Sequence, residues 1–215
     1  MADILLDKQS GPTTPSAGQG IIFIDTTAPI LSLKDDSGLY QAKSSNAAIA
    51  SQGAGFAADT YLTNSDVLIP SFGLQAKAVF LWQISASKTA AGVATPIYSI
   101  RIGAARATSD TQRWTATGPA QTAIADIGTL FILATVRNIG AAAVIQGTAW
   151  WIHRGTAAST TVSGTGFAND VTGHVEASSA TFDSSGLAGN YIGLSINGGA
   201  SAAWTLTQVY SRADW

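Results

Sequence analysis

The side chains best suited to acid–base or metal chemistry are few and widely separated. The two histidines are His153 and His174, and the acids nearest to them are Asp170, Glu176 and Asp183. Two imidazoles and a carboxylate can bind zinc, and the pair Asp170 and Glu176 could support glycoside hydrolysis. However, the histidines lack close ligand spacing, and Asp in turns ordinarily makes local hydrogen bonds. We expect no metal, no cofactor and no catalytic residue, and the prediction is a non-enzyme; an enzyme acting on polysaccharide is the weakest alternative.

The adjacent pair Trp150-Trp151 is the more informative signal. Neighbouring side chains of a strand point to opposite faces, so one tryptophan is expected in the core and the other on the outer face. An outward tryptophan can pack under a loop, contact another copy of the chain, or provide a platform on which a sugar stacks. These three interpretations stay open at this point, and Trp150 and Trp151 are the candidate interface or glycan residues.

The composition indicates a chain that buries much of its surface in an assembly. Of the 215 residues only 11% are charged, 46% are hydrophobic and none is cysteine. So few charges disfavour a free, highly soluble monomer. The net charge is −2 and the basic residues are scattered singly, which excludes the basic patch that nucleic-acid binding needs. We expect no membrane segment either, because the longest apolar run, Leu130–Val136, is far shorter than the roughly 20 residues of a span.

Short segments rich in Val, Ile, Thr, Tyr and Trp, bounded by turn residues, predict strands over most of the chain. The expected strands are Tyr61–Ile69, Ala76–Ser87, Thr95–Ile102, Thr111–Ala116, Gly128–Arg137, Ala143–Arg154, His174–Phe182, Tyr191–Ile196 and Trp204–Ser211. The one helix candidate is Pro119–Ile127, where proline could occupy the first turn. The predicted fold is all-β, an antiparallel β-sandwich, and the long connections favour a jelly roll.

The first 45 residues predict a small β-hairpin arm. Gly20–Ile24, Pro29–Lys34 and Leu39–Gln41 alternate with turn residues, and a meander of this size is marginal on its own. Residues 42–59 are a composition break, which we interpret as a linker or a loosely packed lead-in strand. The predicted organisation is an attachment arm at 1–45, a linker at 46–57 and a β-sandwich for oligomerisation at 58–215.

The arm resembles a small β module found near the N-termini of tailed-bacteriophage structural proteins. The resemblance covers about 30 residues, and the chain's end, WTLTQVY, is similar to the trimeric jelly-roll heads of such proteins. The matching residues, which become the candidate attachment residues, are Pro12, Pro15, Gly18, Gly20, Phe23, Asp25, Leu31, Leu33, Lys34, Asp35, Asp36 and Gly38. The long repetitive shaft of a tail fibre is missing, which favours a compact protein bound to the capsid.

The resemblance implies a non-enzymatic virion structural protein on the phage particle surface. The expected partners are two further copies in a homotrimer and a major capsid protein or other virion protein, which the arm would bind. In the favoured version the protein decorates and cements the capsid. In the alternative it is a tail-fibre or baseplate receptor-binding protein, and a host surface glycan is then a further partner.

Overall fold

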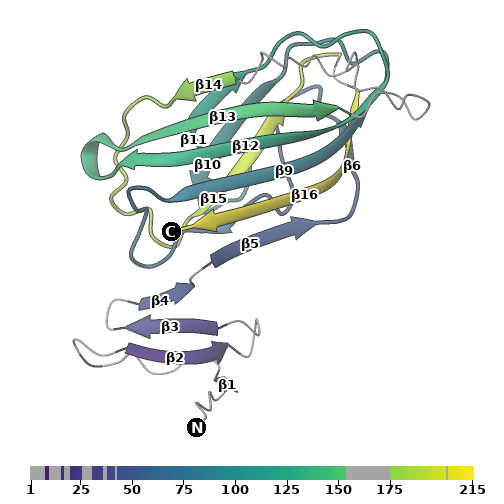
Figure 1. Ribbon diagram of the computed structural model, residues 1–215. Coiled ribbons are helices and arrows are strands. Elements are labelled where there is room, and N and C mark those ends of the chain that lie inside the picture. The colour runs from purple at the N-terminus through teal and green to yellow at the C-terminus, as the bar shows by residue number, and fades with distance from the viewer. Residues whose placement is uncertain are drawn as a thin grey trace.

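Two antiparallel sheets pack against each other in the computed structural model, which describes residues 8–9, 16, 20–25, 31–35, 38–41, 43–153, 175–201 and 203–215 (Figure 1). The seven-stranded sheet has the order β14 (Val175–Ser178), β13 (Val144–His153), β12 (Asp126–Asn138), β9 (Val79–Lys88), β16 (Trp204–Asp214) and β5 (Lys43–Ala48), and β6 (Gln52–Gly55) also pairs with β16. The five-stranded sheet has the order β11 (Thr111–Thr117), β10 (Ile97–Gly103), β15 (Tyr191–Asn197) and β7 (Thr60–Tyr61), and β8 (Val67–Leu68) pairs with β15.

The predicted β-sandwich is therefore confirmed, whereas the strand order does not confirm the more specific jelly roll. Consecutive strands β10 and β11 pair with each other, as do β12 and β13. The chain changes sheet between β9 and β10, between β11 and β12, and between β15 and β16. Within the part of the chain that the structure describes, all strand pairs of the two sheets are antiparallel.

Alternation along the strands fixes which residues enter the core. In β9 the side chains of Phe80, Trp82 and Ile84 are buried, and those of Leu81 and Gln83 between them are only half-buried. Burial with a period of two is expected where one face of a sheet packs against another sheet. The same alternation continues through β12 and β13, so the core is one layer between the two sheets.

Two tryptophans donate hydrogen bonds from one sheet to the other inside this core. The Trp151 indole of β13 donates to the Tyr98 hydroxyl of β10 at 2.8 Å. The Trp114 indole of β11 donates to the carbonyl of Ala177 in β14, also at 2.8 Å. A buried indole N–H without an acceptor costs about 1–3 kcal/mol, so these contacts fix how the two sheets sit against each other.

A third indole attaches the turn between β7 and β8. Trp82 of β9 donates to the carbonyl of Ser65 at 2.7 Å. The Ser65 hydroxyl donates to the carbonyl of Leu194 and accepts from its amide, at 3.2 and 3.0 Å. These side-chain bonds replace ladder bonds where the edge of the five-stranded sheet is interrupted.

The segment 119–125 is not the predicted helix. Its backbone turns irregularly before β12 begins at Asp126. The segment instead holds the buried ammonium group of Lys88, whose Nζ donates to the carbonyls of Thr122 and Ile124, both at 2.7 Å. The Thr122 carbonyl also accepts from the Ile124 amide at 2.8 Å, which closes a turn tighter than a helical one.

A separate sheet precedes the sandwich and lies outside it (Figure 1). It has the order β1 (Lys8–Gln9), β2 (Gly20–Asp25), β3 (Leu31–Asp35) and β4 (Gly38–Gln41). Strands β2, β3 and β4 form an antiparallel meander at the positions that the sequence predicts, and β1, which was not predicted, pairs with β2 in parallel.

The boundary of the sandwich differs from the predicted one. Residues 46–57 are expected to be a linker, but β5 and β6 occupy most of this stretch and pair with β16. Small residues such as Ala47 and Ala48 suit a strand lying at the sheet's edge. The lead-in strand, the second interpretation of this segment, describes it better, and the chain joins the sandwich at Lys43. Among the described residues no helix is long and apolar enough to cross a membrane.

Substituting Gly147 with alanine should destabilise the sandwich. A Cβ atom at this buried position would lie 2.6 Å from Cε2 of Trp114, so the indole that joins the sheets would have to move. We expect the free energy of unfolding in urea to fall by about 1–3 kcal/mol. The control is Gly53→Ala, because a Cβ there has no neighbour within 4 Å. Equal stability of the two variants would contradict this account of the core.

Stability should decrease above pH 10 because of Tyr98. Burial raises the pKa of its hydroxyl, and the bond from Trp151 opposes this only in part. The folded protein therefore keeps a proton that the unfolded chain loses near its ordinary pKa of 10, so the contribution is complete below pH 10 and is lost as pH rises. The wild-type free energy of unfolding should fall by about 1.4 kcal/mol per pH unit more than that of Tyr98→Phe. Parallel pH profiles of the two proteins would refute it.

Candidate interaction surface

The outer face of the seven-stranded sheet carries the outward side chains of its four central strands. The strand register places Trp150 of β13, Phe131 of β12, Gln83 of β9 and Tyr210 of β16 side by side in one row across this face. The next row contains Thr148, Leu133, Leu81 and Arg212. Hydroxyl, amide, aliphatic and aromatic groups thus dominate the centre of the face.

The Trp150-Trp151 pair divides between the two faces as predicted. Trp151 is buried in the core, where its ring meets Trp204 edge-on with centroids 5.6 Å apart. Trp150 points outward and stacks on Phe131, with ring centroids 5.5 Å apart and an interplanar angle of 14°. Phe131 therefore covers one side of the Trp150 indole.

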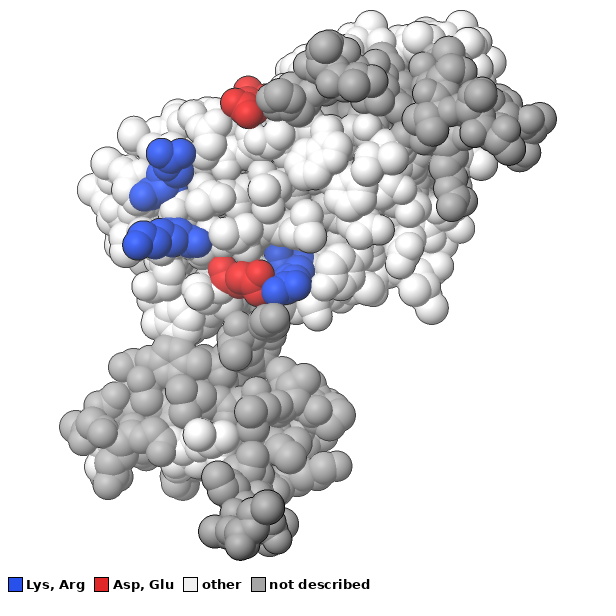
Figure 2. Space-filling model, viewed as in Figure 1, with Lys and Arg blue, Asp and Glu red and all other residues white. Residues whose placement is uncertain are grey.

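Large aliphatic side chains on this face are exposed to solvent in the single chain. Ile127, Leu133 and Ile152 expose 47%, 40% and 53% of their surface. Figure 2 shows a broad area of this face without charged groups. Exposed aliphatic and aromatic groups among uncharged polar ones, here Thr148 and Gln83, can form a protein–protein contact.

The outer face of the five-stranded sheet has the opposite character. Arg101 of β10 pairs with Asp59 at 2.5 Å and donates to the Ser195 hydroxyl of β15 at 2.8 Å. Arg106 pairs with the buried carboxylate of Asp66 at 2.7 Å. Charged groups thus meet in pairs on this face, and the pairing stabilises the carboxylate that is buried.

The chemistry-bearing residues named from the sequence do not form a described site. His174 and Asp170 lie outside the described residues, and so does the side chain of His153. Glu176 is exposed on β14, and the exposed Asp183 carboxylate accepts from the Ser185 amide at 2.8 Å. Among the residues that the structure describes, no three His, Cys, Asp or Glu side chains lie close enough to hold a metal.

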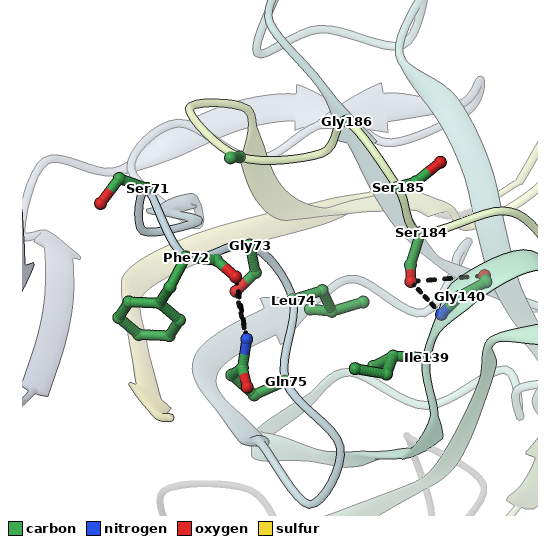
Figure 3. A pocket seen from close by; sticks show the side chains of 11 residues that line it. Ser71, Phe72, Gly73, Leu74, Gln75, Ile139, Gly140, Ser184, Ser185 and Gly186 are labelled. Atoms are coloured by element: carbon green, nitrogen blue, oxygen red, sulfur yellow. Dashed lines mark hydrogen bonds between the residues drawn. The ribbon is translucent and has the colours of Figure 1, made fainter. Parts of the chain in front are cut away.

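A hollow of about 360 Å³ at the end of the sandwich, near the β12–β13 turn, is lined by hydroxyl, amide and apolar groups (Figure 3). Its polar groups serve the loops that form it. The Ser184 hydroxyl accepts from the Gly140 amide at 2.8 Å, and the Gln75 amide donates to the Phe72 carbonyl at 2.9 Å. The polar groups around this hollow therefore hold the loop ends in place, and they do not form a reactive site.

The candidate attachment residues fall mostly on the strands of the N-terminal sheet. Gly20, Phe23 and Asp25 lie on β2, Leu31, Leu33, Lys34 and Asp35 on β3, and Gly38 on β4, while Pro12, Pro15, Gly18 and Asp36 lie outside the described residues.

An apolar row crosses this small sheet. The register aligns Ile22 with Leu33 and Leu33 with Tyr40, and Ile22 is 57% exposed. A small sheet with an open isoleucine on one face is suited to docking on another surface.

Comparisons with known proteins give this chain no relatives: no family model matches it, and no curated protein is significantly similar to it.

Sequence reasoning found Trp150 but missed its partner Phe131 and the exposed Leu133. A signal was present in the run LFILATV, which is apolar at both alternating positions over Leu130–Leu133. A strand with only one buried face should alternate with polar residues. The outward residues Phe131 and Leu133 depart from this alternation.

Proposed function

We propose that the protein is a non-enzymatic structural component of a bacteriophage particle, which assembles with its own copies and attaches to the particle by its N-terminal sheet. The observation that carries the proposal is the outer face of the seven-stranded sheet. Its centre lacks charge and holds the Phe131–Trp150 stack together with the exposed Leu133.

Copies of the same chain are the occupant that best fits this face. Burying the open aliphatic groups contributes about 25 cal/mol for each Å² of apolar surface. The rim adds charges of both signs, because Arg212 and Asp214 lie next to each other on β16, with their side chains 2.9 Å apart. Closed cyclic assembly also covers exposed strand edges. The number three comes from the resemblance to trimeric phage heads.

The N-terminal sheet supports an attachment role because it lies outside the sandwich and exposes Ile22. One such sheet offers a small contact, but three on one trimer would bind together and raise the overall affinity by about 10²–10⁴. The resemblance of residues 12–38 to phage attachment modules favours a virion protein as the partner, and a capsid protein in a decorating role.

Introducing a charge at Leu133 should weaken assembly. Leu133→Lys places an ammonium group in the uncharged centre of the face, so we expect the association constant from sedimentation velocity to fall at least about tenfold. The control is Thr115→Lys, which adds the same charge at an exposed strand position of the five-stranded sheet. If both variants assemble like the wild type, the face is not the interface.

Deleting residues 1–40 should separate attachment from assembly. We expect the shortened chain to retain the oligomeric state of the full chain, because β5 to β16 form the sandwich without β1 to β4. It should no longer co-sediment with capsids of the phage that encodes it, whereas the full chain should. Undiminished co-sedimentation would remove the arm from the proposal and leave the oligomer standing.

A further inference from the structure

We propose that the five-stranded side of the sandwich carries a binding site for a neutral saccharide, in the hollow beside Tyr61, Asp66 and Arg106. This function goes beyond the proposed structural role and does not depend on it. The hollow encloses about 340 Å³ and is lined by Tyr61, Thr63, Asn64, Asp66, Ala105 and Arg106. It is distinct from the Trp150 surface, because the two lie on opposite sheets.

A buried ion pair forms the centre of the site. The Asp66 side chain is only 4% exposed, yet its Oδ2 accepts from Nη2 of Arg106 at 2.7 Å, and the arginine is 44% exposed. The guanidinium also lies 4.7 Å above the ring of Tyr191. Held between the carboxylate and this ring, Arg106 is fixed in orientation while part of its fork of N–H donors still faces solvent.

Tyr61 lines the hollow with its ring. Its hydroxyl is closed off from solvent and has no hydrogen-bond partner among the described residues. The ring lies against Gly193, where a Cβ atom would come within 1.8 Å of the hydroxyl oxygen. Burial and the neighbouring carboxylates of Asp66 and Asp110 raise the pKa of Tyr61, so the hydroxyl stays uncharged and adds no negative charge to the hollow.

The rim of the hollow is held open by two residues in left-handed backbone conformations, Asn64 at φ 59° and Arg106 at φ 55°. The Asn64 side chain is anchored to the Ala47 carbonyl at 3.1 Å. Such conformations cost about 1–3 kcal/mol each and persist only where the surroundings fix them. The rim is therefore a preformed shape.

The charged residues around the hollow determine which class of ligand it can bind. Asp66 neutralises Arg106, Asp59 neutralises Arg101, and the buried Asp110 adds one further negative charge nearby. This excess of negative charge would repel an anion, so phosphate and carboxylate ligands are disfavoured. Hydroxyl groups both donate and accept, and the vicinal hydroxyls of a sugar match an acceptor and a donor placed side by side, as in the Asp66–Arg106 pair.

The test measures binding of neutral methyl glycosides to the full chain by saturation-transfer NMR. The probes are the methyl glycosides of glucose, galactose, mannose and N-acetylglucosamine, with glucuronate and methyl phosphate as charged comparators. We expect at least one neutral probe to bind with a dissociation constant of about 1 mM and both anions to bind more weakly. No binding by any neutral probe, or tighter binding by an anion, would overturn the proposal.

Two variants locate the site. Asp66→Asn removes the buried charge, and Ala105→Trp fills the hollow from an exposed loop position, so it should leave the fold intact. Each should weaken binding of the glycoside at least about tenfold. Arg212→Ala, which breaks an ion pair on the other sheet, is the control and should bind normally. Wild-type affinity in Ala105→Trp would place the sugar elsewhere and refute the proposal. Because saccharide binding is measured for each chain, this result is independent of oligomeric state.

Discussion

The structure depends on tryptophan indoles that must find acceptors across the core. Each of Trp114 and Trp151 lies in one sheet and donates to an oxygen of the other. An aromatic side chain of this size contributes much apolar burial, and an acceptor for its N–H group avoids a cost of about 1–3 kcal/mol. The relative position of the sheets is therefore fixed by hydrogen-bond geometry as well as by the non-directional hydrophobic effect.

The relative position of the two sheets determines which side chains lie on each outer face. Where Trp151 points inward, Trp150 must point outward, and the register then brings Phe131 beside it. On the other sheet Tyr98 points inward to meet Trp151, so Arg101, three residues further along β10, faces outward and pairs with Asp59. On the first face the charged groups, such as the Arg212–Asp214 pair, lie away from the Phe131–Trp150 stack, whereas the second face carries the Arg101–Asp59 and Arg106–Asp66 pairs. The first face thus fits the proposed contact with other copies, and the second fits contact with water and polar ligands.

Strand positions were predictable because alternation and turn residues are local signals, and β9, β10, β12, β13, β15 and β16 all lie within a few residues of their expected bounds. The helix predicted at Pro119–Ile127 is absent; its segment instead binds Lys88, about 35 residues away, and no local signal shows this contact. Similarly, Trp150 was found from its sequence neighbour, but its stacking on Phe131 required the register of β12 against β13. The polar hollow was not predicted, since Tyr61, Asp66 and Arg106 come together only through long-range pairing of β7 and β8 with β15.

Hydroxyl-radical footprinting of the unmodified protein tests most directly whether other copies cover the seven-stranded sheet. Leu133 and Ile97 are 40% and 37% exposed in the single chain and lie on opposite sheets, so they form a matched pair. Our account predicts that oxidation of Leu133 and Trp150 slows as the protein concentration rises, while Ile97 is oxidised at a constant rate. Equal rates for Leu133 and Ile97 at every concentration would contradict it.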